Sequence, residues 1–346
     1  MSETRRTATP LPEATTALNE GLVWAIRCVP GEKPVALEPE EIAACLAGQP
    51  LAGGTGWSWL HFDVVHTLSR AQIDAIPCLP EDVRQVLISS DRGVRLEAEG
   101  EIVSGALPAF EEADADDERE VGIWRFAILP DLLITTRRHP VPALGVVYRE
   151  LQRRQVPPNP ARLVDRVLLE FADIARRDLA RLEDQLDRTE DVLLTLDRDT
   201  DLGRMSAQLG QVRRRSAELR RAVAPVTRIL QDEELELPEW AEDDLSDRSH
   251  RQIHAALDDL IALQDRARSL QDELTSNQAE ETNRRLYIVS VGTTLMLPAT
   301  FVTGFFGMNT GGMFLSGGAW DTVYAGGICF LIMLGTWIIL KLTRML

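Results

Sequence analysis

The 346-residue chain is short of several residue types, and each shortage excludes a class of protein. Its four cysteines form no CxxC pair and no short Cys/His spacing, which excludes a disulfide framework and a structural zinc site. Only 37 basic residues stand against 54 acidic ones, a net charge of -17, which argues against nucleic acid as a partner because phosphate binding needs a basic face. No nucleophile stands at a suitable spacing from a base, so we expect neither enzymatic activity nor a cofactor.

Charge is nearly absent from the C-terminal end of the chain, where the residues after Arg285 include only three charged side chains, Asp321, Lys341 and Arg344. Residues 286–306 and 323–340 are two uncharged runs, and about twenty such residues suffice to span ~30 Å of hydrocarbon. They predict two transmembrane helices in a lipid bilayer. Basic residues flank the pair, so we expect the loop 307–322 outside and both termini, including the tail 341–346, in the cytoplasm. The first residues lack the apolar core of a signal peptide, which agrees with a cytoplasmic N-terminus.

Polar and small residues recur along one face of the first span at steps of three, four or seven. They are Asn283, Ser290, Thr293 (or Thr294), Leu297, Thr300 and Gly304, followed by Gly307. Such residues in a membrane helix face other protein or a water-filled path, and ordinary small-residue helix packing is the alternative. Two helices of one chain cannot enclose a channel, so a pore would require a closed cyclic oligomer with this helix innermost.

The part before the membrane divides into four segments. Residues 1–20 are polar and expected to be disordered. Residues 21–160 predict an α/β domain, because six apolar runs between Leu22 and Arg137 read as strands, with helical patterns between them. Residues 161–245 predict a helical hairpin, and 246–285 a stalk helix that continues into the first span without a turn signal.

The stalk helix carries apolar residues in a nearly heptad pattern, at Ile253, Leu257, Leu260, Ala267, Leu270 and Leu274. Residues 246–306 form roughly sixty residues of helix, ~90 Å long, and a helix of that length needs partners. We expect the heptad seam to pack against neighbouring copies, which supports a homo-oligomer.

His250 and His254 stand four residues apart on the stalk helix, near Asp258. An i, i+4 histidine pair is a possible zinc-binding arrangement. Solvated polar residues on a charged helix are the more common explanation of such a pair.

Gly307-Met308-Asn309 directly follows the first membrane helix and precedes the second. This placement resembles the GMN signature of the CorA superfamily of divalent-cation transporters. Further runs resemble the ZntB zinc-transporter branch of that superfamily. They are Trp59-Leu-His-Phe-Asp, Leu79-Pro-Glu-Asp-Val, Leu270-Gln-Asp-Glu-Leu, Glu281-Thr-Asn-Arg-Arg-Leu-Tyr and Leu297-Pro-Ala-Thr-Phe-Val-Thr-Gly.

The resemblance implies a CorA-like homopentameric funnel in a bacterial inner membrane. It implies that Asn309 forms a ring at the outer mouth, with Gly307 and Met308 shaping the turn, and that Asn283 forms a second ring at the inner end. The transported ion would be Zn²⁺, with proton coupling suggested by the resemblance alone.

Two alternatives remain open. A CorA-type Mg²⁺, Co²⁺ or Ni²⁺ channel would share every feature above. Phe306 stands where magnesium-type members usually carry tyrosine, so a hydroxyl near the filter is missing. The uncharged run after the signature weakens electrostatic capture of a cation, and it is what we expect of the zinc branch and not of the magnesium branch. A membrane-anchored oligomeric scaffold or sensor that conducts nothing would need the helices but not the polar stripe.

Overall fold

The computed structural model describes residues 21–49, 56–111, 120–153, 156–194, 202–232, 235–245, 247–307 and 320–342. The chain forms two compact units. One comprises Met1–Thr200 with Ala207–Arg268, and the other comprises Asp201–Ser206 with Ser269–Leu346.

The N-terminal part of the first unit is built on a seven-stranded mixed sheet in the order β2-β1-β3-β7-β6-β5-β4. The strands are β1 (Leu22–Cys28), β2 (Val35–Ala36), β3 (Trp57–Asp63), β4 (Arg95–Glu99), β5 (Ile102–Phe110), β6 (Val121–Leu129) and β7 (Leu132–Arg137). Neighbouring strands are antiparallel except β3 and β7, which are parallel. The six predicted strands are confirmed, and the two-residue edge strand β2 is an addition.

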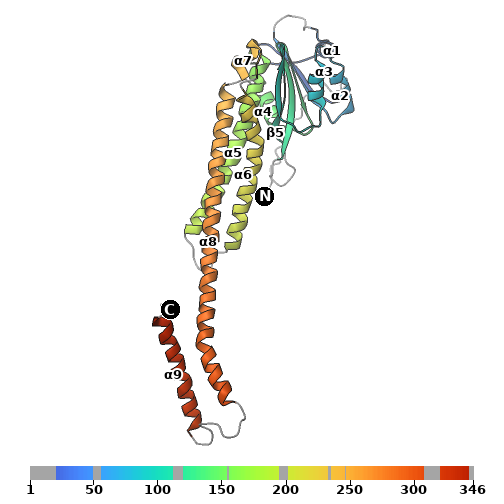
Figure 1. Ribbon diagram of the computed structural model, residues 1–346. Helices are drawn as coiled ribbons and strands as arrows, with labels where there is room; N and C mark the ends of the chain where they lie inside the picture. Colours follow the sequence, from blue (N-terminus) through green and yellow to red (C-terminus); the bar gives the residue numbers. More distant parts are fainter. Residues whose placement is uncertain are drawn as a thin grey trace, which may run out of the picture. The chain divides into compact units, whose positions relative to one another are not determined.

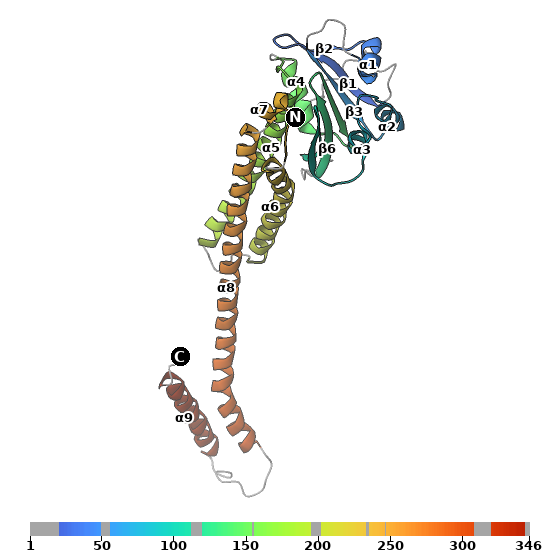
Figure 2. The same ribbon diagram turned by 45° about the horizontal axis from the view of Figure 1, so that its top comes forward.

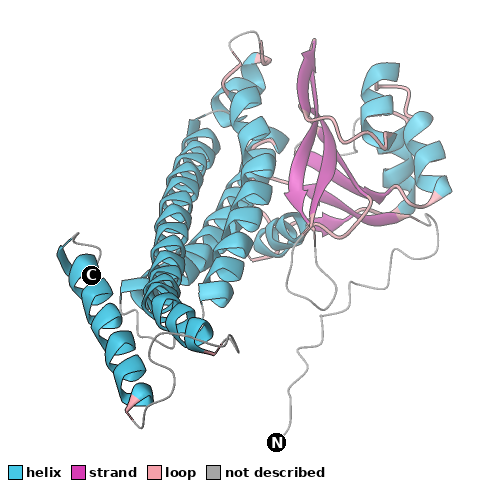
Figure 3. Ribbon diagram, turned by 60° about the horizontal axis from the view of Figure 1, so that its bottom comes forward, coloured by secondary structure: helices cyan, strands magenta, loops and turns pink. Residues whose placement is uncertain are grey.

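Helices cover both faces of this sheet. On one face lie α1 (Pro39–Leu46), α2 (Thr67–Asp74) and α3 (Glu81–Ile88), and on the other lie α4 (Pro142–Leu151) and the start of α5 (Pro160–Leu194) (Figures 1 and 3). Alternate residues of β3 serve the two faces, as strand geometry requires. Leu60 and Phe62 join the core with α1–α3, whereas Trp59 lies 6.3 Å from Tyr148 of α4 between ring centroids.

One buried hydroxyl organises the polar atoms beneath α4. The Oγ1 of Thr135 accepts the Trp59 Nε1–H at 2.8 Å and lies 2.7 Å from Nδ1 of His61. The His61 ring stacks on Trp24 at 4.1 Å and is fully buried. Burial, with the nearby positive charge of Arg137, holds the pKa of His61 well below its usual value, so the ring is neutral in the folded chain.

Three long helices run side by side beyond the sheet (Figures 1 and 2). They are α5, α6 (Leu202–Leu230) and α8 (Asp247–Phe306), with the short α7 (Glu239–Leu245) before α8. Arg266 of α8 pairs with Asp187 of α5 at 2.7 Å, and Arg220 of α6 donates to Gln264 of α8 at 3.0 Å. The long uninterrupted helix predicted from Ser246 to Phe306 is present as α8.

The heptad seam of α8 is filled within the chain, so the expectation that it packs against neighbouring copies is wrong. Ile253, Leu260 and Ala267 are each fully buried in a single chain. Gln264 and Arg266 flank the seam on the sides of α6 and α5. A heptad spacing indicates a packing seam, but it does not say whether the partner helix belongs to the same chain.

The predicted membrane spans lie in α8 and in α9 (Asp321–Leu342). Among the described residues, the helix Arg248–Phe305 contains a stretch long and apolar enough to cross a membrane, and 6% of that stretch is buried. Gly326–Leu342 forms a shorter apolar helix. Large apolar side chains such as Ile288, Phe301 and Leu331 point outward from these helices, which suits a lipid surrounding and not water.

The neutral, buried state of His61 predicts an acid-sensitive α/β domain. The unfolded chain binds a proton at this ring near the ordinary histidine pKa of ~6.5, whereas the folded chain does not, so the free energy of unfolding should fall as pH drops below that value, by up to ~1.4 kcal/mol per pH unit. Denaturant unfolding followed by tryptophan fluorescence at pH 7.5 and 5.5 measures this effect. The control His61→Phe keeps a flat ring and should lose part of the pH dependence; an unchanged dependence would contradict the assignment.

Candidate functional site

The six stripe residues predicted in α8 and at its entrance to the apolar segment all lie on the outer surface of the chain. Asn283, Ser290, Thr293, Leu297, Thr300 and Gly304 are each exposed. An α-helix advances about 100° per residue, so the six positions share one side of α8. Leu286 lies on that side too, seven residues before Thr293, and sequence reasoning missed it although the same seven-residue step would have found it. The stripe therefore alternates polar, small and apolar side chains.

The opposite side of α8 is less exposed. Val302 is buried at 8% exposure, and Val291, Leu295 and Pro298 are half-buried. The Sγ of Cys329 in α9 lies 4.0 Å from the carbonyl oxygen of Ala299. The second apolar helix thus contacts α8 away from the stripe, and the stripe stays exposed.

The threonine hydroxyls of the stripe donate their protons to their own helix, which fixes the orientation of each hydroxyl. Thr293 donates its hydroxyl proton to the carbonyl oxygen of Val289 at 2.8 Å, and Thr300 donates to that of Met296 at 3.0 Å. A hydroxyl has one proton and two lone pairs, so each oxygen keeps acceptor capacity after this bond. The stripe consequently presents electron pairs, which suit a cation or the protons of its hydration water.

Gly304 and Gly307 differ in the space around them. A Cβ at Gly304 would meet no atom within 4 Å, so the surroundings leave room for a side chain. The stripe has none at this point only because the residue is glycine. The N–H of Gly307 donates to Thr303 at 2.9 Å, and a Cβ there would stand 3.1 Å from the same carbonyl oxygen. Gly307 thus continues the backbone hydrogen bonding of α8 at a position with little room for a side chain. The other two residues of the signature, Met308 and Asn309, lie outside the described residues.

The histidine pair of the stalk stays a prediction. The rings of His250 and His254 lie 6.2 Å apart in an edge-to-face arrangement, and Nδ1 of His254 lies 3.1 Å from Oδ2 of Asp258. No group of three or more His, Cys, Asp or Glu side chains suited to a metal ion occurs among the described residues. Two histidines alone leave a zinc ion short of its usual four ligands.

The family of the chain follows from comparison with known proteins. The family model described as "CorA-like Mg2+ transporter protein" matches residues 54–344, and the chain belongs to this family of divalent-cation transporters. The chain is accordingly a transporter and not an enzyme, as its sequence led us to expect.

Two relatives carry a more particular name. The zinc transport protein ZntB of Yersinia enterocolitica is 29% identical over 261 residues, which cover 74% of this chain and 77% of the relative. The protein of the same name from Klebsiella pneumoniae is 28% identical over 268 residues, covering 76% and 79%.

Solved structures share the fold. The full-length CmaX protein aligns with a TM-score of 0.77 at 23% identity, covering 94% of this chain and 98% of that one. The complete CorA magnesium transporter from Methanocaldococcus jannaschii aligns with a TM-score of 0.65 at 17% identity, covering 92% and 98%. The ZntB cytoplasmic domain from Vibrio parahaemolyticus aligns at 0.59 and 14% identity, covering 75% and 99%. The predicted CorA-like architecture of an α/β domain, long helices and a C-terminal helix is confirmed.

Proposed function

We propose that this chain moves Zn²⁺ across a bacterial inner membrane through a homopentameric pore lined by α8. The observation that carries the proposal is the exposure of the stripe, on a side of α8 away from its contact with α9 at Ala299. A closed ring of chains with α8 innermost would turn that face toward a central axis. The number five and the inner membrane rest on the family resemblance, and both termini would lie in the cytoplasm with the loop 307–322 in the periplasm.

The ion would enter and cross as a partly hydrated species. Asn309 would form a ring at the outer mouth, held by the tight turn of Gly307 and Met308, and its amide oxygens would accept hydrogen bonds from the ion's water. Below it, Thr300 and Thr293 would present their free lone pairs, and Asn283 would form a last polar ring at the inner end. Neutral oxygens attract a divalent ion without holding it so tightly that it cannot leave.

The choice of Zn²⁺ rests on the two relatives named zinc transport proteins, at 29% and 28% identity. A second candidate is Mg²⁺, favoured by the description of the matching family. Residues 286–306 and 323–340 contain no carboxylate, histidine or lysine that could relay protons, so any proton coupling would act through the cytoplasmic part of the chain. This proposal assigns no role to His250 and His254.

Ion uptake into liposomes that contain the purified chain tests the transported ion. We expect Zn²⁺ uptake that Mg²⁺ neither replaces nor blocks, and a response to an imposed pH gradient would establish proton coupling. The substitution Asn309→Ala should abolish uptake while the oligomer stays assembled, whereas Ser316→Ala in the same loop should not. Dominant Mg²⁺ uptake would assign the chain to the magnesium-type transporters, and the absence of any uptake would refute the pore.

The orientation of the Thr293 and Thr300 hydroxyls predicts that Zn²⁺ uptake depends on their lone pairs. Thr293→Val with Thr300→Val preserves side-chain shape and removes the lone pairs, so Zn²⁺ uptake should fall about tenfold or more, since losing ~1.4 kcal/mol of stabilisation slows a step tenfold. The matched control is Thr303→Val with Thr336→Val. These hydroxyls also bond to their own helices, at 3.0 and 2.9 Å, but they lie outside the stripe. Equal losses in the two double variants would show that the threonines act through helix stability and not through the path.

A further inference from the structure

Helix α6 is strongly basic in an acidic chain. Between Leu202 and Leu230 it carries a single acid, Glu218, and seven arginines, at positions 204, 213, 214, 215, 220, 221 and 228. The whole chain has a net charge of -17, so this concentration of positive charge is local to one helix. Surface charge of one sign gathered on one element indicates attraction for a partner of the opposite sign.

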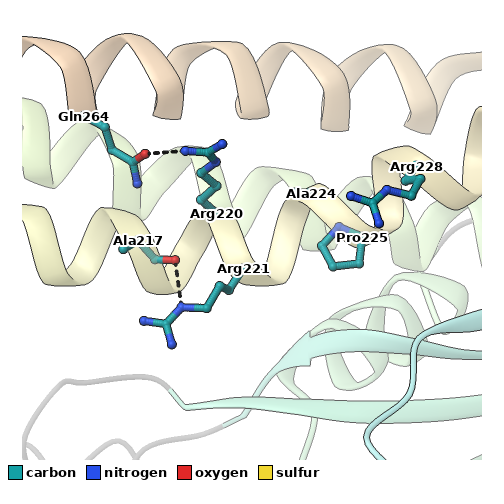
Figure 4. Close-up of a pocket in the computed structure, with 7 residues that line it drawn as sticks. All are labelled: Ala217, Arg220, Arg221, Ala224, Pro225, Arg228 and Gln264. Carbon is teal, nitrogen blue, oxygen red and sulfur yellow. Dashed lines mark hydrogen bonds between the residues drawn. The ribbon is translucent and has the colours of Figure 1, made fainter.

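Three of these arginines line a groove of about 410 Å³ (Figure 4). Arg220, Arg221 and Arg228 stand around a floor of Ala217, Ala224 and Pro225, and Gln264 of α8 closes one side. No carboxylate lines this groove. Arg220 donates to the amide oxygen of Gln264 at 3.0 Å, and Nε of Arg221 donates to the carbonyl oxygen of Ala217 at 3.3 Å. Both acceptors are neutral, so neither bond cancels a guanidinium charge.

In a neighbouring groove of about 330 Å³ between α5 and α6, two arginines are paired with acidic side chains. There Arg181 pairs with Asp178 at 3.3 Å, and Arg215 pairs with Glu218 at 3.0 Å, with all four residues in the lining. That groove supplies its own counter-charges. The groove at Pro225 supplies none from its lining residues, which leaves its guanidinium groups to an external anion.

The spacing of the arginines selects the anion. Arg221 and Arg228 are seven residues apart, or ~10 Å along the helix, with Pro225 between them. The three arginines around the groove carry three positive charges. One phosphate offsets about two of them at neutral pH, whereas a chain of two or three phosphates carries enough charge and oxygens for all three. Guanidinium forks bind phosphate oxygens in pairs, and the free Nε2 of Gln264 adds an uncharged donor.

We propose that the groove of Arg220, Arg221, Arg228 and Gln264 binds a polyphosphate chain, free or carried by a nucleoside. The bound chain would bridge α6 and α8 within the first unit. This site is independent of the ion path, because none of its residues belongs to the apolar segments.

Isothermal titration calorimetry on the full-length chain in detergent, without divalent metal, tests the proposal. The probes are ATP, inorganic tripolyphosphate and inorganic phosphate. Both polyphosphates should bind and inorganic phosphate should bind at least about tenfold more weakly, because it carries less negative charge and fewer oxygens for the three guanidinium groups. Tighter binding of ATP would identify a nucleotide as the source, and equal binding would identify the phosphate chain alone.

Two double variants locate the site. Arg221→Gln with Arg228→Gln should weaken tripolyphosphate binding about tenfold or more, and Arg213→Gln with Arg214→Gln, which removes the same charge from the same helix outside the groove, should leave it within about threefold. Circular dichroism confirms that both variants keep their helices. Equal weakening in both pairs would overturn the site in favour of diffuse attraction to α6, and failure of either polyphosphate to bind the unmodified chain would overturn it outright. Neither result depends on whether the chain conducts ions.

Discussion

The structure depends on how helix α8 divides its surface between two neighbours. From Asp247 to Phe306 it is one continuous helix whose backbone bonds are internal, except at Pro298, which has no N–H to donate to the carbonyl of Thr294. In its first half, one side is buried against α5 and α6, through Ile253, Leu260 and Ala267. In its second half, Ala299 contacts Cys329 of α9, and Val302 is buried on the same side. Because the chain's own helices occupy those sides, the stripe of Ser290, Thr293 and Thr300 stays uncovered, and this is the basis of the proposed ion path.

Charged side chains are also divided between the apolar segments and the long helices that precede them. The membrane segments present no ionisable group along the stripe and offer hydroxyl and amide oxygens, which accept without fixing a net charge. The long helices α5 and α8 carry ionic contacts, such as the pairs of Arg266 with Asp187 and of Arg177 with Glu170 at 2.7 and 2.8 Å. The proposed ion path is neutral, whereas α6 presents a basic surface of seven arginines and one acid. The two proposals address these two surfaces separately.

Much of the fold could be predicted from local patterns. The apolar runs gave the six main strands of the sheet, and the absence of any turn signal between Leu274 and Leu286 predicted the continuity of α8. Strand order could not be predicted, because the parallel pairing of β3 with β7 joins segments some seventy residues apart through contacts that no local pattern encodes. The partner of the heptad seam was predicted wrongly for a related reason, since Ile253 and Leu260 would look the same against another chain.

The sequence predicted which candidate residues share one face of α8, but not whether the rest of the chain covers that face. Spacing alone placed Thr293 and Thr300 on one face, and the structure adds that both are exposed, away from the contact of α9 with Ala299. Leu286 was not predicted, although it lies seven residues before Thr293. The groove at Pro225 could not be anticipated either, since Gln264 reaches it from another helix.

Water accessibility of α8 in liposomes tests the central claim most directly. Single cysteines at Thr293 and Thr300, and for comparison at Leu295 and Val302, would be introduced after Cys78 and Cys329, the two partly exposed native cysteines, are replaced by alanine. A charged, water-soluble thiol reagent would then be applied during ion uptake. The account predicts that cysteines at 293 and 300 react and that their modification blocks uptake, while those at 295 and 302 do not react. Reaction at 295 and 302 with none at 293 and 300 would contradict it.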